Sequence, residues 1–456
     1  MNQYQNISPL DFRYRIPELE AYFTEEASIR HQIKVEIAIA KMLAKYGVCS
    51  NEAYEEIKRE AQKVTVEEVY NEDRKTKHTP RAMVNCIQRR VSKDARPFVH
   101  LGATSSDIYD TANAMRLRDA TRDIILPDLL KLEKHFMRIA AREKDTLQIG
   151  RTHGQHAVPI TFGFAMAEYV SRLGNAIAET ERANKNLRGL LSGATGSYNA
   201  LSLVVSDPEA FERDVLQELG LEPASHSTQI IEPEFLTNHT HALTTVFGVI
   251  ANFVRDMRQL QRTEIAEVSE GFSKTQVGSS TMPHKRNPVS FEHVEGLWKE
   301  LMPRMMTLYL DQVSEHQRDL SNYSSGRFVF EIAHGLDGAV RRLNHVMENL
   351  LVDRKRMRQN FEMSRGTIIA EPLYVLLAAV GHPDAHEAVR KLTLQAEKSK
   401  YNILDLLAKD KKLKQYVQKI PKKKLSILAN PEKYTGLASE KTVEVCKYWQ
   451  GKLYSV

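Results

Sequence analysis

The chain is 456 residues long, which is enough for two or three domains and a large buried core. Hydrophobic residues make up 42% of it and charged residues 27%, so a collagen-like, a disordered and a membrane-embedded class are excluded. The 64 Lys and Arg residues exceed the 58 acidic residues by a net charge of +6, which suits anionic small molecules as well as nucleic acids.

The amino-terminal sequence, MNQYQNISPLDFRYR, has no apolar segment behind a basic start. No run of about 18 apolar residues follows, so we expect no membrane partner. The three cysteines, Cys49, Cys86 and Cys446, lie far apart without a CxxC pair. This spacing argues against a disulfide framework and a structural zinc site, and we expect a cytoplasmic protein.

Four stretches carry apolar residues alternately three and four positions apart, which is the spacing of one helix face. They lie at residues 125–139, 162–177, 243–260 and 332–350. Alternating patterns typical of strands are scarce, so the sequence predicts an all-α fold around a central bundle of long helices.

The composition changes near residue 350, where a lysine-rich segment follows. Between Lys398 and Lys424 there are ten lysines and two aspartates, with apolar residues interleaved. This pattern is typical of helices with a solvated face, and nucleic-acid binding is the less favoured alternative. We predict an amino-terminal helical domain, a central bundle and a lysine-rich carboxyl-terminal helical domain, at 1–110, 111–350 and 351–456.

Six of the 21 glycines fall in four segments between the predicted helices, 101–107, 150–157, 192–197 and 277–288. Polar residues in such loops are good functional candidates, because a rigid scaffold positions them. The chain has no GxGxxG, P-loop, HExxH or GxSxG motif, so dinucleotide, P-loop, zinc-protease and hydrolase functions have no support. His153 and His156 have no carboxylate or cysteine at ligand spacing, so we expect no metal site.

The segment 278–288 combines a Gly-Ser-Ser entry with a proline and two adjacent cations, Lys285 and Arg286. Its backbone N–H groups and Lys285 could hold a carboxylate or a developing oxyanion. A serine there could act as a base only if these charges lower its pKa. On composition alone, a basic surface loop is the simpler interpretation.

This segment nevertheless resembles the signature of the fumarase/aspartase superfamily, SSxMPxKxN followed by a glutamate. The matching residues are Ser279, Ser280, Met282, Pro283, Lys285, Asn287 and Glu292. The segments GATSSD (102–107) and GRTHGQH (150–156) precede it in the superfamily's order. The segments TKH (76–78), MPHKRNP (282–288) and HPDAHEAVRKLTLQA (382–396) are most similar to the superfamily's purine branch.

The resemblance implies a lyase without a cofactor that removes fumarate from adenylosuccinate and from succinylaminoimidazole carboxamide ribotide. This β-elimination needs a base, stabilisation of a dianion and an acid for the departing nitrogen. By resemblance, Ser279 is the base, aided by Lys285, and His153 is the acid, oriented by Glu292. His78 is expected beside the substrate. The resemblance also implies a homotetramer in which each active site combines loops of three subunits.

The resemblance assigns further residues to the succinyl carboxylates and the nucleotide. They are Arg13, Tyr14, His100, Thr104, Ser105, Thr152, Gln229, Ser280, Met282, Asn287, Arg318 and Arg327. His156 is expected to be structural.

Two positions depart from the family pattern. Tyr323 stands where the family usually has a serine, and residues 230–234 replace an Arg-Asp pair. The alternatives are therefore another lyase of the superfamily, such as argininosuccinate lyase or a carboxymuconate cycloisomerase-like enzyme, and a helical scaffold without catalytic activity.

Overall fold

The computed structural model describes residues 7–271, 281–282, 284–399 and 401–454. The chain folds into two compact units. Unit 1 contains residues 1–130, 175–250 and 295–342, and unit 2 contains residues 131–174, 251–294 and 343–456. The division falls within five helices, and the three domains predicted from the sequence stay a prediction.

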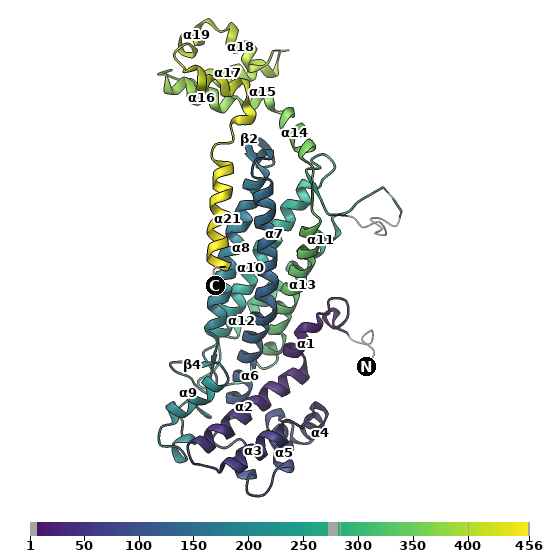
Figure 1. Cartoon of the computed structure of the whole chain (residues 1–456), viewed down its shortest axis with the longest axis vertical. Coiled ribbons are helices and arrows are strands. Elements are labelled where there is room, and N and C mark those ends of the chain that lie inside the picture. Colours follow the sequence, from purple (N-terminus) through teal and green to yellow (C-terminus); the bar gives the residue numbers. More distant parts are fainter. Residues whose placement is uncertain (1–6, 272–280, 283, 400, 455–456) are drawn as a thin grey trace. The chain divides into compact units, whose positions relative to one another are not determined.

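Helices dominate the described residues (Figure 1). The five helices that contribute to both units are α7 (Leu126–Arg142), α8 (Phe162–Lys185), α10 (Glu234–Leu260), α11 (Val289–Leu301) and α13 (Val329–Glu348). The other helices of unit 1 are η2 (Pro9–Asp11), α1 (Pro17–Phe23), α2 (Glu25–Lys45), α3 (Asn51–Ala61), α4 (Val66–Thr76), α5 (Thr79–Arg90), η3 (Arg96–Phe98), α6 (Ser105–Ala120), the π-helical η4 (Thr121–Ile125), η5 (Leu201–Leu203), α9 (Pro208–Glu218), η6 (Met302–Arg304), α12 (Met305–Leu310) and η7 (Ser325–Phe328).

The other helices of unit 2 are α14 (Arg354–Met363), α15 (Arg365–Ile368), α16 (Ala370–Ala379), α17 (Ala385–Glu397), α18 (Ile403–Lys409), α19 (Lys411–Val417), α20 (Lys422–Ala429), η8 (Pro431–Lys433) and α21 (Ala438–Tyr454). This helical content confirms the predicted all-α class.

The four predicted apolar stripes coincide with α7, α8, α10 and α13, with Ile125 just before α7 and Leu350 just after α13. Their residues are buried except for the partly buried Leu260. In unit 2, Phe136 of α7 and Phe253 of α10 have ring centroids 4.5 Å apart. Tyr169 of α8 packs edge-on against Phe253 at 5.1 Å. Burial of each such side chain contributes about 1.5–3 kcal/mol, so the periodicity that predicted the helices also explains why they pack together.

In unit 1, helix α2 packs along α6. The side chain of Thr24 accepts a hydrogen bond from the backbone N–H of Ala27 and so caps the start of α2. The buried face of α2 carries Ile29, Ile33 and Leu43. These apolar side chains belong to the same buried cluster as apolar residues of α6.

Six short strands form three two-stranded sheets in the described part of the chain. The sheets are β1 (Leu147–Thr152) with β2 (Gln155–Thr161), β3 (Arg188–Gly189) with β4 (Glu222–Pro223), and β5 (Val268–Ser269) with β6 (Leu351–Val352). We expected a loop at 150–157, but this segment forms most of the β1–β2 hairpin. His153 and Gly154 have φ angles of 54° and 73°, as the two central residues of a tight hairpin turn require.

The short helices α16–α20 surround their own apolar cluster, which includes Leu377, Leu392 and Ile420. The lysines of this segment that the structure describes are exposed. Lys419 lies 5.5 Å from the ring centroid of Tyr416. The segment therefore has the buried face and the solvated lysine face that its sequence predicts.

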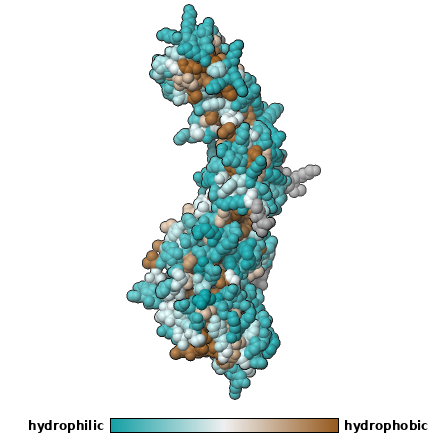
Figure 2. Space-filling view, turned by 60° about the vertical axis from the view of Figure 1, so that its left-hand side comes forward, coloured by the Kyte–Doolittle hydropathy of each residue, from teal (hydrophilic) through white to brown (hydrophobic). Residues whose placement is uncertain are grey.

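Within the described ranges, no helix combines the length and the apolar character needed to cross a membrane. Figure 2 shows a largely hydrophilic surface with scattered hydrophobic patches. Several large apolar side chains in and after α12 are exposed, among them Met306, Leu310 and Val313.

Candidate active site

The amino-terminal end of α6 gathers three of the predicted residues. The backbone N–H of Thr104 donates to Oδ2 of Asp107 at 2.7 Å. The Oγ atom of Ser105 lies 3.3 Å from Nε2 of His78. Because Nδ1 of His78 accepts from the backbone N–H of Arg81 at 3.2 Å, Nε2 carries the proton of the neutral ring. A helix amino terminus attracts anions, so this end of α6 suits a carboxylate.

His100 precedes this helix and is paired with Glu36, a residue outside the motifs named above. Its Nδ1–H donates to Oε1 of Glu36 at 2.7 Å, and the two side chains are 20% and 1% exposed. Burial lowers the pKa of His100, but the charge and the hydrogen bond of Glu36 outweigh burial and raise this pKa above its ordinary value. The structure thus places His78, His100, Thr104 and Ser105 around one end of α6.

Asp107 joins this end of α6 to the glycine-rich segment 192–197. Its Oδ1 accepts from the backbone N–H groups of Ser192, at 3.1 Å, and of the following residue, at 3.4 Å. The Oγ atom of Ser192 lies 2.7 Å from that of Ser227. A Cβ at Gly196 would lie 2.1 Å from the carbonyl oxygen of Ser227, so only glycine permits this approach. These contacts hold the segment that carries the partly buried Gln229.

Two of the predicted arginines lie between α12 and α13. The guanidinium of Arg327 stacks on the ring of Tyr323, 5.0 Å from its centroid, and Nη2 donates to the tyrosine hydroxyl at 2.8 Å. Arg318 donates from Nη1 to Oδ1 of Asn322 at 3.1 Å. The tyrosine that replaces the family's serine therefore orients Arg327 with its ring and its hydroxyl.

The third predicted arginine, Arg13, is exposed near the amino terminus. The carbonyl oxygen of the adjacent Tyr14 accepts from Nε2 of His334 on α13 at 2.9 Å. This bond ties the amino-terminal segment to a helix of unit 1.

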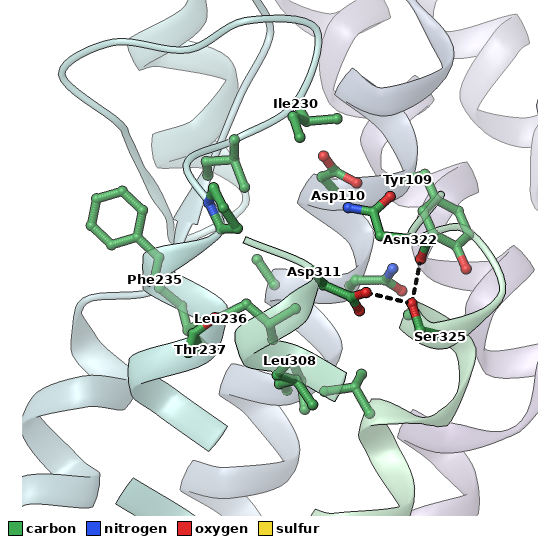
Figure 3. Close-up of a pocket in the computed structure, with 18 of the residues that line it drawn as sticks. Tyr109, Asp110, Ile230, Phe235, Leu236, Thr237, Leu308, Asp311, Asn322 and Ser325 are labelled. Atoms are coloured by element: carbon green, nitrogen blue, oxygen red, sulfur yellow. Dashed lines mark hydrogen bonds between the residues drawn. The ribbon is translucent and has the colours of Figure 1, made fainter. Parts of the chain in front are cut away.

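A cavity of about 140 Å³ lies beside Arg318 (Figure 3). Ser325 donates to Oδ1 of Asp311 at 2.8 Å on its wall. Burial raises the pKa of Asp110 to about 6, while the charge of Arg318 opposes the shift. Tyr323 lines this cavity together with Ile230, Ile231 and Pro233 of the departing segment 230–234, so the two departures from the family pattern meet at one place.

In unit 2, Thr152 and His153 lie at the exposed tip of the β1–β2 hairpin. The left-handed backbone of His153 puts its side chain at the turn, where it can meet a ligand. Farther along the hairpin, Nδ1 of His156 lies 2.7 Å from Oγ of Ser364, and burial lowers the pKa of His156. This contact supports the structural role expected for His156.

Ser279 and Ser280, the predicted base and its neighbour, lie outside the described residues. The segments that flank them are held by Gln261, which follows α10. Its side-chain oxygen accepts from the backbone N–H of Glu270 at 3.1 Å, and its side-chain nitrogen donates to the carbonyl oxygen of Arg286 at 3.4 Å. Gln261 therefore contacts described residues on both sides of the serine segment.

Glu270 also caps α11. Its carboxylate accepts from the backbone N–H groups of the second and third residues of this helix at 3.2 and 2.8 Å. This cap fixes the start of the helix that carries Glu292. Oε1 of Glu292 lies 3.7 Å from Nη2 of Arg258, and no contact with His153 is seen among the described residues. The expected action of Glu292 on His153 stays a prediction.

Met282, Lys285 and Asn287 complete the predicted loop. The backbone N–H of Lys285 donates to the carbonyl oxygen of Met282 at 3.0 Å, which closes a turn. Met282 and Lys285 are exposed and Asn287 is partly buried. The Lys285 ammonium is accordingly open to solvent and to a bound anion.

Within residues 7–271, 281–282, 284–399 and 401–454, no group of three or more His, Cys, Asp or Glu side chains is placed to hold a metal ion. Glu36, Asp107 and Glu270 hold the candidate residues, and no motif of the sequence pointed to these three roles. The sequence did contain a signal for Glu36, because this carboxylate lies on the same apolar helix face as Ile33 and Ala40.

Comparisons with known proteins agree along the whole chain. Residues 11–302 match the family model described as lyase, and residues 314–435 match the model described as adenylosuccinate lyase C-terminal. The adenylosuccinate lyase of Methanocaldococcus jannaschii is 32% identical and covers 98% of this chain and 97% of its own length. That of Pyrococcus abyssi is 33% identical, with 97% and 98% covered.

Two solved structures have the same fold. The 3-carboxy-cis,cis-muconate lactonizing enzyme of Pseudomonas putida gives a TM-score of 0.83 at 25% identity, covering 97% of this chain and 98% of its own. A fumarate lyase from Mesorhizobium sp. BNC1 gives 0.83 at 23% identity, covering 95% and 98%. The fold and the matched loops define a lyase of the fumarase/aspartase superfamily. Since relatives of more than 30% identity cover nearly all of it, the chain belongs to the adenylosuccinate lyase family.

Proposed function

We propose that this lyase removes fumarate from adenylosuccinate, giving AMP, and from succinylaminoimidazole carboxamide ribotide, giving aminoimidazole carboxamide ribotide, in purine biosynthesis. The observation that carries the proposal is the match to an adenylosuccinate lyase along 98% of the chain. The similarity to the muconate lactonizing enzyme supports the cycloisomerase alternative less, because it concerns the fold at lower identity.

The chemistry breaks a carbon–nitrogen bond without a cofactor. Ser279 removes the proton beside a succinyl carboxylate, and the electron pair forms the double bond of fumarate as the carbon–nitrogen bond breaks. His153 gives its proton to the departing nitrogen. Lys285 lowers the pKa of the serine and stabilises the dianion, and Glu292 orients His153.

The succinyl carboxylates fit the amino-terminal end of α6. Here Thr104 and Ser105 supply hydroxyl and backbone donors, His78 supplies the Nε2–H that faces Ser105, and His100 adds an imidazole whose pKa Glu36 raises. By resemblance, Thr152, Gln229, Ser280, Met282 and Asn287 are also assigned to the substrate.

The nucleotide phosphate needs cations, and the proposed ones are Arg13, Arg318 and Arg327, with Tyr14 beside the first. A guanidinium fork suits a phosphate because two parallel N–H groups meet two oxygens. The stacking of Arg327 on Tyr323 supports this role, since it leaves the guanidinium fixed at the protein surface.

We also propose a cytoplasmic homotetramer with a shared core of long helices. The exposed side chains of Leu310, Val313 and Phe328 support self-association, because apolar surface is stabilised when a second copy covers it. Light scattering should give four times the chain mass of 52.0 kDa. A monomer mass at micromolar concentration would contradict this assembly.

The experiment offers the purified protein adenylosuccinate, argininosuccinate and 3-carboxymuconate in separate reactions. We expect fumarate from adenylosuccinate, and neither fumarate from argininosuccinate nor a lactone from 3-carboxymuconate. Loss of a charge-assisted phosphate contact in Arg13→Ala or Arg327→Ala should raise the KM for adenylosuccinate about ten- to a hundredfold. The matched control is Arg15→Ala, since Arg15 is exposed and pairs with Glu20. If the two variants turn over adenylosuccinate as the parent does, the nucleotide assignment is wrong.

A further inference from the structure

Helix α2 buries a carboxylate on its apolar face. Glu36 lies on the face that carries Ile33 and Ala40, and it is 2% exposed. Burying a carboxylate costs several kcal/mol unless a partner compensates. Oε1 is bound by His100, whereas Oε2 has no hydrogen bond with any residue that the structure describes. The imidazole is therefore the compensating partner of this charge.

The backbone of His100 is also strained at the position from which its side chain reaches Glu36. Its φ of 66° lies in the left-handed region, which costs a residue other than glycine about 1 kcal/mol. With Nδ1 bound to Glu36, the nitrogen that remains is Nε2, and it has no hydrogen bond with the described residues. The side chain is one-fifth exposed, so Nε2 can reach a ligand. Strain that orients a partly exposed side chain is typical of functional sites.

The charged groups around the imidazole come from three helices. They are Glu36 of α2, Asp107 of α6 and Arg81 of α5. Glu36 and Asp107 favour the imidazolium and Arg81 opposes it, and Glu36 is the largest of these charge effects. The net pKa of His100 is raised despite its burial.

We propose that Glu36 is a positioning residue, which fixes the ring of His100 through Nδ1 and keeps it cationic so that Nε2–H binds an oxyanion of the substrate. This inference rests on the proposed function for the identity of that oxyanion, which is a succinyl carboxylate or the nucleotide phosphate. A pair that only anchored α2 to the loop would need neither the charge nor the exposed nitrogen.

The test uses Glu36→Gln in the full-length chain, because glutamine keeps the size and an acceptor but removes the charge. Histidine NMR titration should show a lower pKa for His100 and no change at His31. The His31 side chain lies on the same helix, bonds to the carbonyl oxygen of Ala27 and has a pKa lowered to about 4 by burial. The matched control variant is Glu26→Gln, since Glu26 is exposed on α2.

Turnover supplies the second readout. For Glu36→Gln we expect kcat/KM for adenylosuccinate to fall about ten- to a hundredfold near pH 8 and to recover toward the parent value at lower pH, where His100 is protonated without help. Glu36→Asp, which keeps the charge, should restore part of the loss. If fumarate inhibits Glu36→Gln more weakly than the parent, His100 binds the succinyl carboxylate. If AMP inhibits the variant more weakly, His100 binds the nucleotide phosphate.

An unchanged pKa of His100, or a loss of kcat/KM that is equal at every pH, would overturn the proposal and leave a structural pair. The role of Glu36 and the proposed function of the protein can be refuted separately. If the parent protein released no fumarate, the proposed function would fail, whereas the NMR titration would still report whether Glu36 controls the charge of His100.

Discussion

Glu133 of α7 should make the stability of this protein fall as the pH rises. Its side chain is fully buried, and neither carboxylate oxygen has a hydrogen bond with a described residue. Burial raises its pKa from 4.5 to about 9. Between these values the folded chain binds more protons than the unfolded chain, so the free energy of unfolding decreases with pH. At about 1.36 kcal/mol for each pKa unit, the loss reaches on the order of 4–5 kcal/mol by pH 8.

Glu133→Gln removes this titration, so the variant should be more stable than the parent at pH 8 and similar to it at pH 5. Urea unfolding followed by circular dichroism, at one fixed protein concentration, measures the difference. Glu179→Gln is the matched control on α8, because Glu179 is half exposed beside Arg182 and its loss should change stability by less than about 1 kcal/mol. Parallel pH profiles for the parent and Glu133→Gln would refute the reasoning.

Three further substitutions test the candidate site. Gly196→Ala forces a Cβ against the carbonyl oxygen of Ser227, so KM should rise about tenfold as the Gln229 segment moves, and an unchanged KM would contradict its place in the site. His156→Asn should lower stability by about 1 kcal/mol in urea unfolding with little effect on kcat, and a large loss of kcat would give His156 a chemical role. Tyr323→Phe keeps the ring but loses the hydroxyl bond to Arg327, so the KM for adenylosuccinate should rise about three- to tenfold, and an unchanged KM would show that the hydroxyl does not orient the arginine.

The helical bundle was predictable because its signal is local and periodic. Phe136 of α7 and Phe253 of α10 each belong to an apolar repeat with the spacing of one helix face, and both are fully buried. The hairpin around His153 was not predicted, because its short strands alternate weakly and two turn residues decide the conformation. Here the His-Gly pair was the signal, since both residues adopt the left-handed backbone of a tight turn.

The partners of the site residues were harder to predict than the residues themselves. Glu36 and Glu133 each occupy an apolar helix face, so the sequence pattern alone does not distinguish them. The structure separates them, because Glu36 meets a histidine 64 residues away whereas Glu133 meets no hydrogen-bond partner among the described residues. Helix periodicity reports which face is buried but carries no information about what a distant loop brings to that face.

The central claim is that this chain eliminates fumarate from adenylosuccinate with Ser279 as the base. The most direct measurement incubates the purified protein with adenylosuccinate and quantifies both products, alongside Ser279→Ala. The proposal predicts AMP and fumarate in equal amounts from the parent, and from the variant no product despite retained substrate binding. Absence of fumarate from the parent, or near-normal turnover by Ser279→Ala, would contradict it.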